Sequence, residues 1–159
     1  MNRQSICHLK SFLLVALAFF TAVSGCKDDE DNYIDGSLVK NYNISYDGVR
    51  ALLYSSSLSV EYMSDTVDGV AALRVTLNAD GLILAAGKTY DLLEYGSVTR
   101  FSDLGSLPEL QSGELTLTEF SEEDGSPVAG NFHAVFVTDD GVTLNLRGAF
   151  AVDLEVVPI

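Results

Sequence analysis

The segment from residue 142 to residue 154 carries an apolar residue or glycine at every second position. These residues are Val142, Leu144, Leu146, Gly148, Phe150, Val152 and Leu154. The positions between them include Thr143, Asn145, Arg147 and Asp153. A period of two predicts a β-strand with one buried face. Because glycine within a strand often marks a bulge or a bend, Gly148 allows one long strand or two joined strands.

A β-hairpin is predicted immediately before and through this segment. Phe132, Ala134 and Phe136 share one strand face, and a turn at residues 138–141 follows them. The turn ends in Asp-Gly, which supplies the positive φ that short hairpin loops need. A second hairpin is predicted from residues 71–77, the Asp-Gly turn at 79–81 and the apolar run at 82–85.

The remaining chain carries weaker signals of the same kind and no convincing amphipathic helix beyond the N-terminal segment. Strands are predicted at 38–46, 49–54, 58–63, 89–93, 97–102 and 114–120. The best helical candidate, 104–110, is interrupted by Gly105 and Pro108. Short strands separated by frequent turns predict an all-β domain over residues 36–159. We expect an antiparallel β-sandwich of about 8–10 strands, with a lipocalin-like β-barrel as the alternative.

The N-terminus has the organisation of a cleaved signal peptide spanning residues 1–25. Arg3 and Lys10 precede an unbroken apolar run at 12–20, and small residues follow it. A basic start, an apolar core of about 7–15 residues and a small-residue exit are typical of secretory signals. The run is shorter than the roughly 20 residues that a membrane-spanning helix needs.

The end of this segment, Val23-Ser24-Gly25-Cys26, resembles a bacterial lipobox. The resemblance implies that Cys26 receives a diacylglyceryl group and that the chain is then cut between Gly25 and Cys26. Most lipoboxes have leucine where Val23 stands. The alternative is ordinary cleavage near Ala22 or Gly25 that leaves Cys26 as a free thiol. One acyl chain holds a protein to a membrane only marginally, and the lipoproteins that this chain resembles carry two or three.

An acidic stretch follows the cysteine directly: Lys27, Asp28, Asp29, Glu30 and Asp31. It resembles the surface-export signal of Bacteroidota lipoproteins, which implies display on the exterior of the outer membrane. The alternatives are a solvated tether with no export role and a periplasmic orientation. In either case we expect residues 26–35 to link the lipid to the folded domain.

The charge of the chain disfavours nucleic acid as a partner. The full sequence has 9 Lys+Arg and 23 Asp+Glu, a formal charge of -14. Removal of 1–25 takes away Arg3 and Lys10 and leaves 134 residues with 7 Lys+Arg, 23 Asp+Glu and a charge of -16. Phosphate backbones are bound by concentrated positive charge, which this chain lacks.

Catalytic and metal-binding patterns are missing from the sequence. His133 is the one histidine beyond the signal peptide, no Gly-x-Ser-x-Gly occurs, and Cys7 is lost on cleavage. His133 alternates with Phe132 and Ala134, which predicts an outward position on a strand. Carboxylates gather in turns at 65–68, 122–124 and 139–140, as solvated loop charges do. A loop calcium site is the alternative for these acids, without EF-hand spacing. We predict no catalytic residue, cofactor, metal site or disulfide.

Tyrosine is the residue type that could form a binding face. All seven lie beyond residue 26, at Tyr33, Tyr42, Tyr46, Tyr54, Tyr62, Tyr90 and Tyr95. They are predicted to fill the core or the sheet faces, with a ligand surface as the alternative. The segments 112–120, 128–136 and 142–150 resemble small uncharacterised Bacteroidota lipoprotein domains with recurring Gly-x-Leu and Gly-x-Phe strands. That resemblance implies an all-β fold and no known activity.

The sequence therefore predicts an outer-membrane lipoprotein whose β domain is a non-enzymatic binding or accessory module. Its ligand residues are not identified, and the expected partners are the membrane, through lipid on Cys26, and a glycan or an envelope protein. The alternative is a structural or assembly subunit of an outer-membrane complex. A hydrolase that uses loop carboxylates is the least favoured hypothesis.

Overall fold

A computed structural model describes residues 31–101 and 105–158 and shows an all-β fold. The described elements are, in chain order, β1 (Tyr33–Asp35), α1 (Ser37–Asn41), β2 (Gly48–Tyr54), β3 (Ser57–Met63), β4 (Ala71–Asn78), β5 (Lys88–Asp91), α2 (Leu92–Tyr95), β6 (Gly96–Thr99), β7 (Glu109–Glu119), β8 (Pro127–Val137) and β9 (Thr143–Val156). The all-β prediction is confirmed. The predicted signal peptide and lipobox, and the acidic stretch as far as Glu30, lie outside the described residues.

The strands form one nine-stranded sheet in the described chain, with the order β5-β7-β8-β9-β2-β3-β4-β6 and β1 beside β9. All pairs are antiparallel except β2 with β9, where Ala51–Leu53 run parallel to Leu154–Val156. The continuous sheet curls into a nearly closed barrel, which corresponds more closely to the barrel alternative than to two separate sheets. The predicted purely antiparallel arrangement is wrong at the β2–β9 pair.

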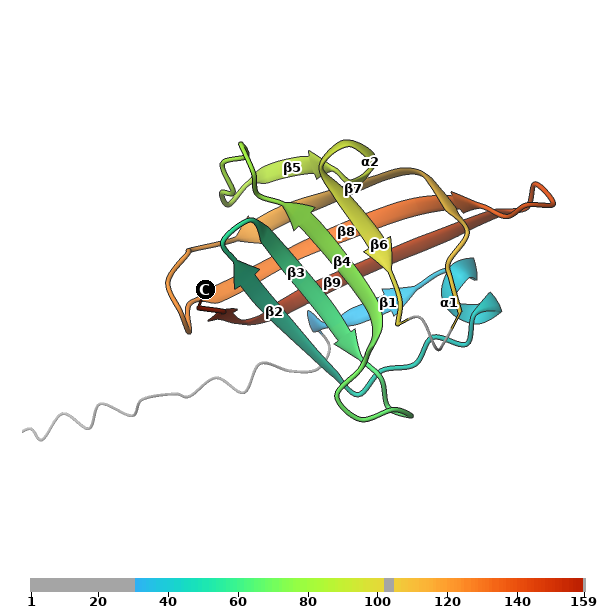
Figure 1. The fold of residues 1–159 in the computed structure, drawn as a ribbon, viewed down its shortest axis with the longest axis horizontal. Coiled ribbons are helices and arrows are strands. Elements are labelled where there is room, and N and C mark those ends of the chain that lie inside the picture. Colours follow the sequence, from blue (N-terminus) through green and yellow to red (C-terminus); the bar gives the residue numbers. More distant parts are fainter. Residues whose placement is uncertain (1–30, 102–104, 159) are drawn as a thin grey trace, which may run out of the picture.

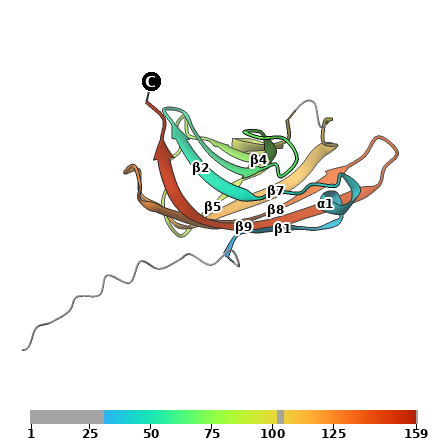
Figure 2. The ribbon, with the colours of Figure 1, turned by 90° about the horizontal axis from the view of Figure 1, so that it is seen from below.

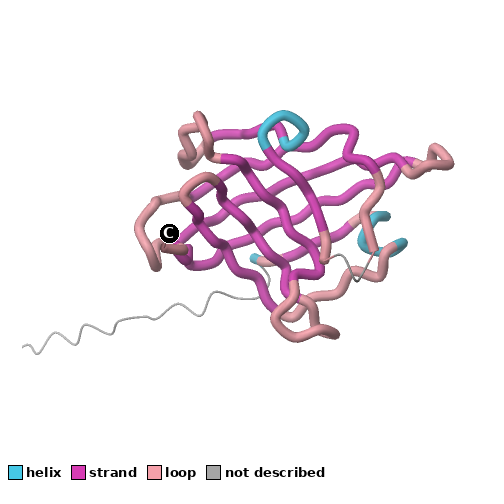
Figure 3. The backbone as a smooth tube through the Cα atoms, in the orientation of Figure 1, coloured by secondary structure: helices cyan, strands magenta, loops and turns pink. Residues whose placement is uncertain are grey.

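The curled sheet encloses one hydrophobic core. In Figure 1, β2, β3 and β4 cross over β7, β8 and β9, and Figure 2 shows the two groups as facing layers joined through β9. Inward side chains of both layers form a single buried cluster that includes Leu58, Leu73, Phe136 and Phe150. The edge strands β5 and β6 are not paired with each other, and α2 connects them (Figure 3). Leu92 of α2 is fully buried there.

The hairpin of β8 and β9 confirms the clearest sequence prediction. Gly141 has a φ of 82° in its turn, as an Asp-Gly loop requires. The β8–β9 register runs without a shift from Pro127↔Asp153 to Val137↔Thr143. Gly148 therefore lies within one long strand, and no register shift marks a bulge there.

The second predicted hairpin is wrong, because residues 82–85 form no strand. Their backbone is bound by a side chain instead. The Tyr90 hydroxyl accepts a hydrogen bond from the Ala85 N–H at 2.9 Å and donates one to the Ile83 carbonyl at 3.0 Å. The pairing partners of β4 are β3 and β6.

Other segments also differ from the prediction. Residues 38–46 contain α1 and a loop rather than a strand, with Asn43 at a positive φ of 47°. The predicted strand at 89–93 ends at Asp91, since the Asp91 carboxylate accepts from the backbone N–H of Leu93 at 2.7 Å and so begins α2. The sheet also begins earlier than predicted, because β1 lies in the segment assigned to the tether.

Candidate functional site

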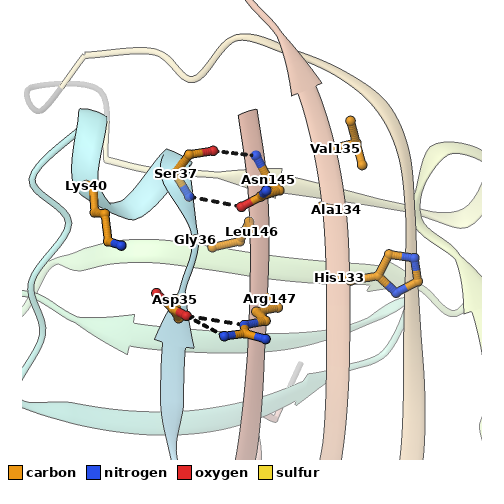
Figure 4. A pocket seen from close by; sticks show the side chains of 10 residues that line it. All are labelled: Asp35, Gly36, Ser37, Lys40, His133, Ala134, Val135, Asn145, Leu146 and Arg147. Carbon is orange, nitrogen blue, oxygen red and sulfur yellow. Dashed lines mark hydrogen bonds and ion pairs between the residues drawn. The ribbon is translucent and has the colours of Figure 1, made fainter. Parts of the chain in front are cut away.

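A polar hollow of about 500 Å³ lies on the outer face of the sheet, where β1 and α1 meet β8 and β9. Figure 4 shows its lining, which consists of Asp35, Gly36, Ser37, Lys40, His133, Ala134, Val135, Asn145, Leu146 and Arg147. Pockets for small ligands commonly measure about 300–1,000 Å³. The size and the mixture of donors and acceptors make this hollow the candidate binding site.

Strand alternation and one glycine build the hollow. His133 on β8 and Arg147 on β9 are partners in the strand register and point away from the core, between inward Phe132, Leu146 and Gly148. This confirms the outward position predicted for His133. Gly36 has a φ of 129°, and a Cβ there would collide with the Asn145 carbonyl oxygen. Glycine is therefore required for the chain to turn from β1 into α1 against β9.

A reciprocal pair of hydrogen bonds fixes the start of α1 beside β9. The Ser37 N–H donates to Asn145 Oδ1 at 3.0 Å, and the Asn145 N–H donates to Ser37 Oγ at 2.9 Å. Both bonds are drawn in Figure 4. They connect residues 108 positions apart in the chain, so the hollow exists only in the folded domain.

An exposed ion pair lies at the floor of the hollow. Arg147 contacts Asp35 Oδ2 through its terminal nitrogen at 2.6 Å and through Nε at 3.3 Å. The hydrogen bond from Arg147, followed by one from the Gly36 backbone, lowers the pKa of Asp35 below its ordinary 3.8. The same hydrogen bond raises the pKa of Arg147.

We expect the Asp35–Arg147 pair to stabilise the domain in a pH-dependent way. A lowered carboxyl pKa contributes stability above the ordinary Asp value of 3.8, and this contribution is lost as pH falls through the folded value below it. Asp35→Asn should therefore lower the melting temperature slightly at pH 7 and by less near pH 2. Thermal melts across this range, with Asp80→Asn in an exposed turn as control, measure the difference. A deficit of equal size at both pH values would contradict the assignment.

Two basic side chains of the hollow form neither a hydrogen bond nor an ion pair within the described chain. Lys40 lies near Asp35 and His133 lies beside Arg147, and neither side chain forms a hydrogen bond or ion pair with the described residues. In Figure 4 they lie on opposite sides of the Asp35–Arg147 pair. Their N–H groups are the donors that a ligand would meet.

A second hollow, of about 470 Å³, lies near the ends of β2 and β9. Most of its lining residues are of apolar type, including Leu53, Leu82, Val156 and Pro158, with Tyr54 beside them. Ile83, in the same loop as Leu82, is 76% exposed. Glu122 is the one charged residue among the described residues of this lining. The first hollow has several charged and polar side chains that could bind one ligand together, and this second hollow does not.

The structure also contains a charged cluster that the sequence did not reveal. Glu61 on β3 is 1% exposed and lies between Arg50 of β2 and Arg74 of β4. Arg50 contacts Glu61 Oε2 at 2.7 Å, and Arg74 contacts Oε1 at 2.6 Å. The only sequence signal is that all three are charged residues within predicted strands. We infer a structural role, since both carboxylate oxygens are already bound.

Two of the seven tyrosines are buried in the core, and two more pack against it, in line with the predicted filling role. Tyr62 is fully buried, and its hydroxyl donates to the Ala149 carbonyl at 2.8 Å, while burial raises its pKa. Tyr90 is buried, and Tyr42 and Tyr46 pack against the core. Tyr54 is 39% exposed and lines the apolar hollow. The polar hollow has no tyrosine in its lining.

The described residues contain no group of three or more His, Cys, Asp or Glu that could hold a metal ion. Their two short helices include none long and apolar enough to cross a membrane. The predicted lipidation and export residues Val23, Ser24, Gly25, Cys26, Lys27, Asp28, Asp29 and Glu30 lie outside the described part, and Asp31 is exposed at its start. No family model, curated protein or solved structure matches this chain.

Proposed function

We propose that this protein is a lipid-anchored outer-membrane protein whose barrel-like β domain is a non-enzymatic binding module on the cell exterior. The single observation that carries the anchor is the lipobox-like sequence ending in Cys26, directly after an apolar segment of signal-peptide length. The acidic residues 28–31 support export to the exterior. The polar hollow is the proposed binding site.

The start of the sheet supports a short connection between lipid and domain. β1 begins at Tyr33, seven positions beyond Cys26. A chain spans at most about 3.5 Å per residue, so Tyr33 lies within about 25 Å of the lipidated cysteine. Asp35, Gly36 and Ser37 of the hollow follow directly, which would hold the binding site near the membrane surface.

The hydrogen bonds made by the polar side chains of the hollow support a binding role rather than a catalytic one. Ser37 Oγ accepts a hydrogen bond from the Asn145 N–H, and the His133 side chain forms no hydrogen bond with the described residues. A hydroxyl or thiol nucleophile is activated by a base within hydrogen-bond reach. The described residues of the hollow contain no such pair, whereas they offer donors and acceptors suited to holding a ligand.

The proposal is tested by lipidation and display of the full-length chain in a Gram-negative host. Cells grown with an alkyne-tagged fatty acid should yield a labelled protein whose mature N-terminus is Cys26, and Cys26→Ser should abolish the label. An unlabelled wild-type chain cleaved elsewhere would contradict the anchor. Protease added to intact cells should then degrade the domain while a periplasmic marker stays intact.

The acidic stretch is examined in the same cells. Neutralising residues 28–31 with Asn and Gln should preserve lipidation and protect the domain from external protease. Asp139→Asn with Asp140→Asn, a matched change in the β8–β9 turn, should leave the wild-type digestion unchanged. Full protection of the wild-type domain would instead place it on the periplasmic face.

A further inference from the structure

Some basic side chains of the described chain are bound by other residues of the domain, and a group of three lines the polar hollow. Arg50 and Arg74 are bound to Glu61, and the Arg100 guanidinium lies 5.8 Å from the centre of the Tyr42 ring. Lys88 stands on the edge strand β5. The remaining three, Lys40, His133 and Arg147, all line the hollow. In a chain of formal charge -14, this concentration of basic side chains favours an anion in the hollow, beside the exposed Glu114 that lies opposite His133 in the β7–β8 register.

The local charge of the hollow defines the kind of anion it fits. Lys40 and Arg147 are cationic and Asp35 is anionic, so with a neutral His133 the lining carries one net positive charge. One carboxylate balances this charge. A phosphate, with a charge of about -1.5 to -2, would lie close to the Asp35 carboxylate without full compensation.

The remaining polar groups favour a ligand that also carries hydroxyls. The Asp35–Arg147 pair is exposed, with 44% and 67% of the two side chains accessible, and presents acceptors and donors side by side. His133 adds a ring that can donate or accept. Hydroxyl groups both donate and accept, so they match this mixture better than a purely acidic or purely apolar ligand does.

We propose that the hollow binds a hydroxylated monocarboxylate of the sugar-acid type. Lys40 forms the charge-assisted hydrogen bond to the carboxylate, while His133 and the Asp35–Arg147 pair bind hydroxyls. This assignment rests on the proposed function as a binding module, and it names the ligand class of that site. The ligand would contact both sides of the hollow, since Lys40 and His133 stand on opposite sides of it (Figure 4). These two residues are 93 positions apart in the sequence.

The test is a calorimetric titration of the full-length protein in detergent micelles. The probes are a glucuronic-acid-terminated disaccharide, its glucose-terminated analogue and glucose 6-phosphate. We expect the acidic disaccharide to bind at least about tenfold more tightly than either other probe, as the loss of one charge-assisted hydrogen bond implies. Lys40→Ala should weaken it about tenfold and His133→Ala about threefold, with unchanged circular dichroism and melting temperature.

The matched controls are Lys88→Ala, an exposed lysine on β5, and Asn131→Ala, an exposed residue on the same strand as His133. Both should bind as the wild type does. Equal affinity for acidic and neutral disaccharides, tighter binding of the phosphate, or a Lys40→Ala variant with wild-type affinity would overturn the inference. Because the titration needs neither lipid nor export, its failure leaves the anchor and display experiments to decide the proposed location separately.

Discussion

Replacing Glu61 by glutamine is expected to lower the free energy of unfolding by about 2 kcal/mol, since Gln cannot bind both flanking guanidinium groups as a carboxylate does. Removing one partner of a buried ion pair costs about 3–5 kcal/mol when the remaining charge stays buried. Here Arg50 and Arg74 are 45% and 48% exposed, so water compensates part of the loss. The two arginines that remain, on β2 and β4 at either side of β3, also repel each other.

Urea denaturation at pH 7 measures this loss, and Glu119→Gln on β7 is the matched control because Glu119 is exposed. The control should change stability by less than about 0.5 kcal/mol. Replacing either arginine alone by alanine leaves one guanidinium on Glu61. The double replacement should therefore cost more than the sum of the two single changes. Additive arginine variants, or a Glu61→Gln variant as stable as the control, would show that the cluster does not act as a unit.

The alternation of side chains was sufficient to predict the strands whose faces differ clearly in polarity. The β8–β9 hairpin and the positions of β2, β3 and β4 follow from local pattern and turn residues. Residues 82–85 have an equally apolar pattern, yet the Tyr90 hydroxyl binds their backbone and replaces a strand partner. A local pattern carries no information about that contact, since it depends on how the chain folds back.

The closure of the sheet and the candidate site both depend on contacts between residues that are far apart in the sequence, so a local pattern could not predict them. β9 is long enough to pair with β8 and then, at Leu154, to run parallel to Ala51 of β2. The hollow combines Asp35 and Lys40 with His133 and Arg147 near the opposite end of β9, where that strand begins. Alternation predicted that His133 points outward, but not that Arg147, Asp35 and Lys40 lie beside it.

The recurring glycine and phenylalanine positions of β8 and β9 acquire a physical explanation from the strand register. Phe132 lies opposite Gly148, and Phe150 lies opposite Gly130. In each pair the ring covers the glycine: a Cβ on Gly148 would lie 2.5 Å from Phe132 Cζ, and one on Gly130 would lie 2.7 Å from Phe150 Cζ. Aromatic rings that cover cross-strand glycines fix register and permit curvature, which a nearly closed sheet requires.

Gly148→Ala is accordingly expected to destabilise the domain by about 3 kcal/mol, because overpacking a filled core forces side chains and backbone to move. The new methyl group would also lie 2.7 Å from the Tyr33 carbonyl oxygen and so displace β1. Phe132→Leu shortens the opposing side chain and should cost about 1 kcal/mol by itself. The double variant should recover about 1 kcal/mol relative to the sum of the single changes, since the collision with the ring is relieved.

Denaturation of the four proteins in this double-mutant cycle measures the coupling directly. The recovery should be incomplete, because the contact with the Tyr33 backbone remains after the ring is shortened. Gly125→Ala serves as the comparison: a Cβ there meets nothing within 4 Å, although its φ of 76° strains any other residue. Its cost should therefore be unaffected by Phe132→Leu. If the Gly148 cycle is as additive as the Gly125 cycle, the Phe132 ring does not pack on Gly148 in solution. The presence of glycine at position 148 would then have another cause.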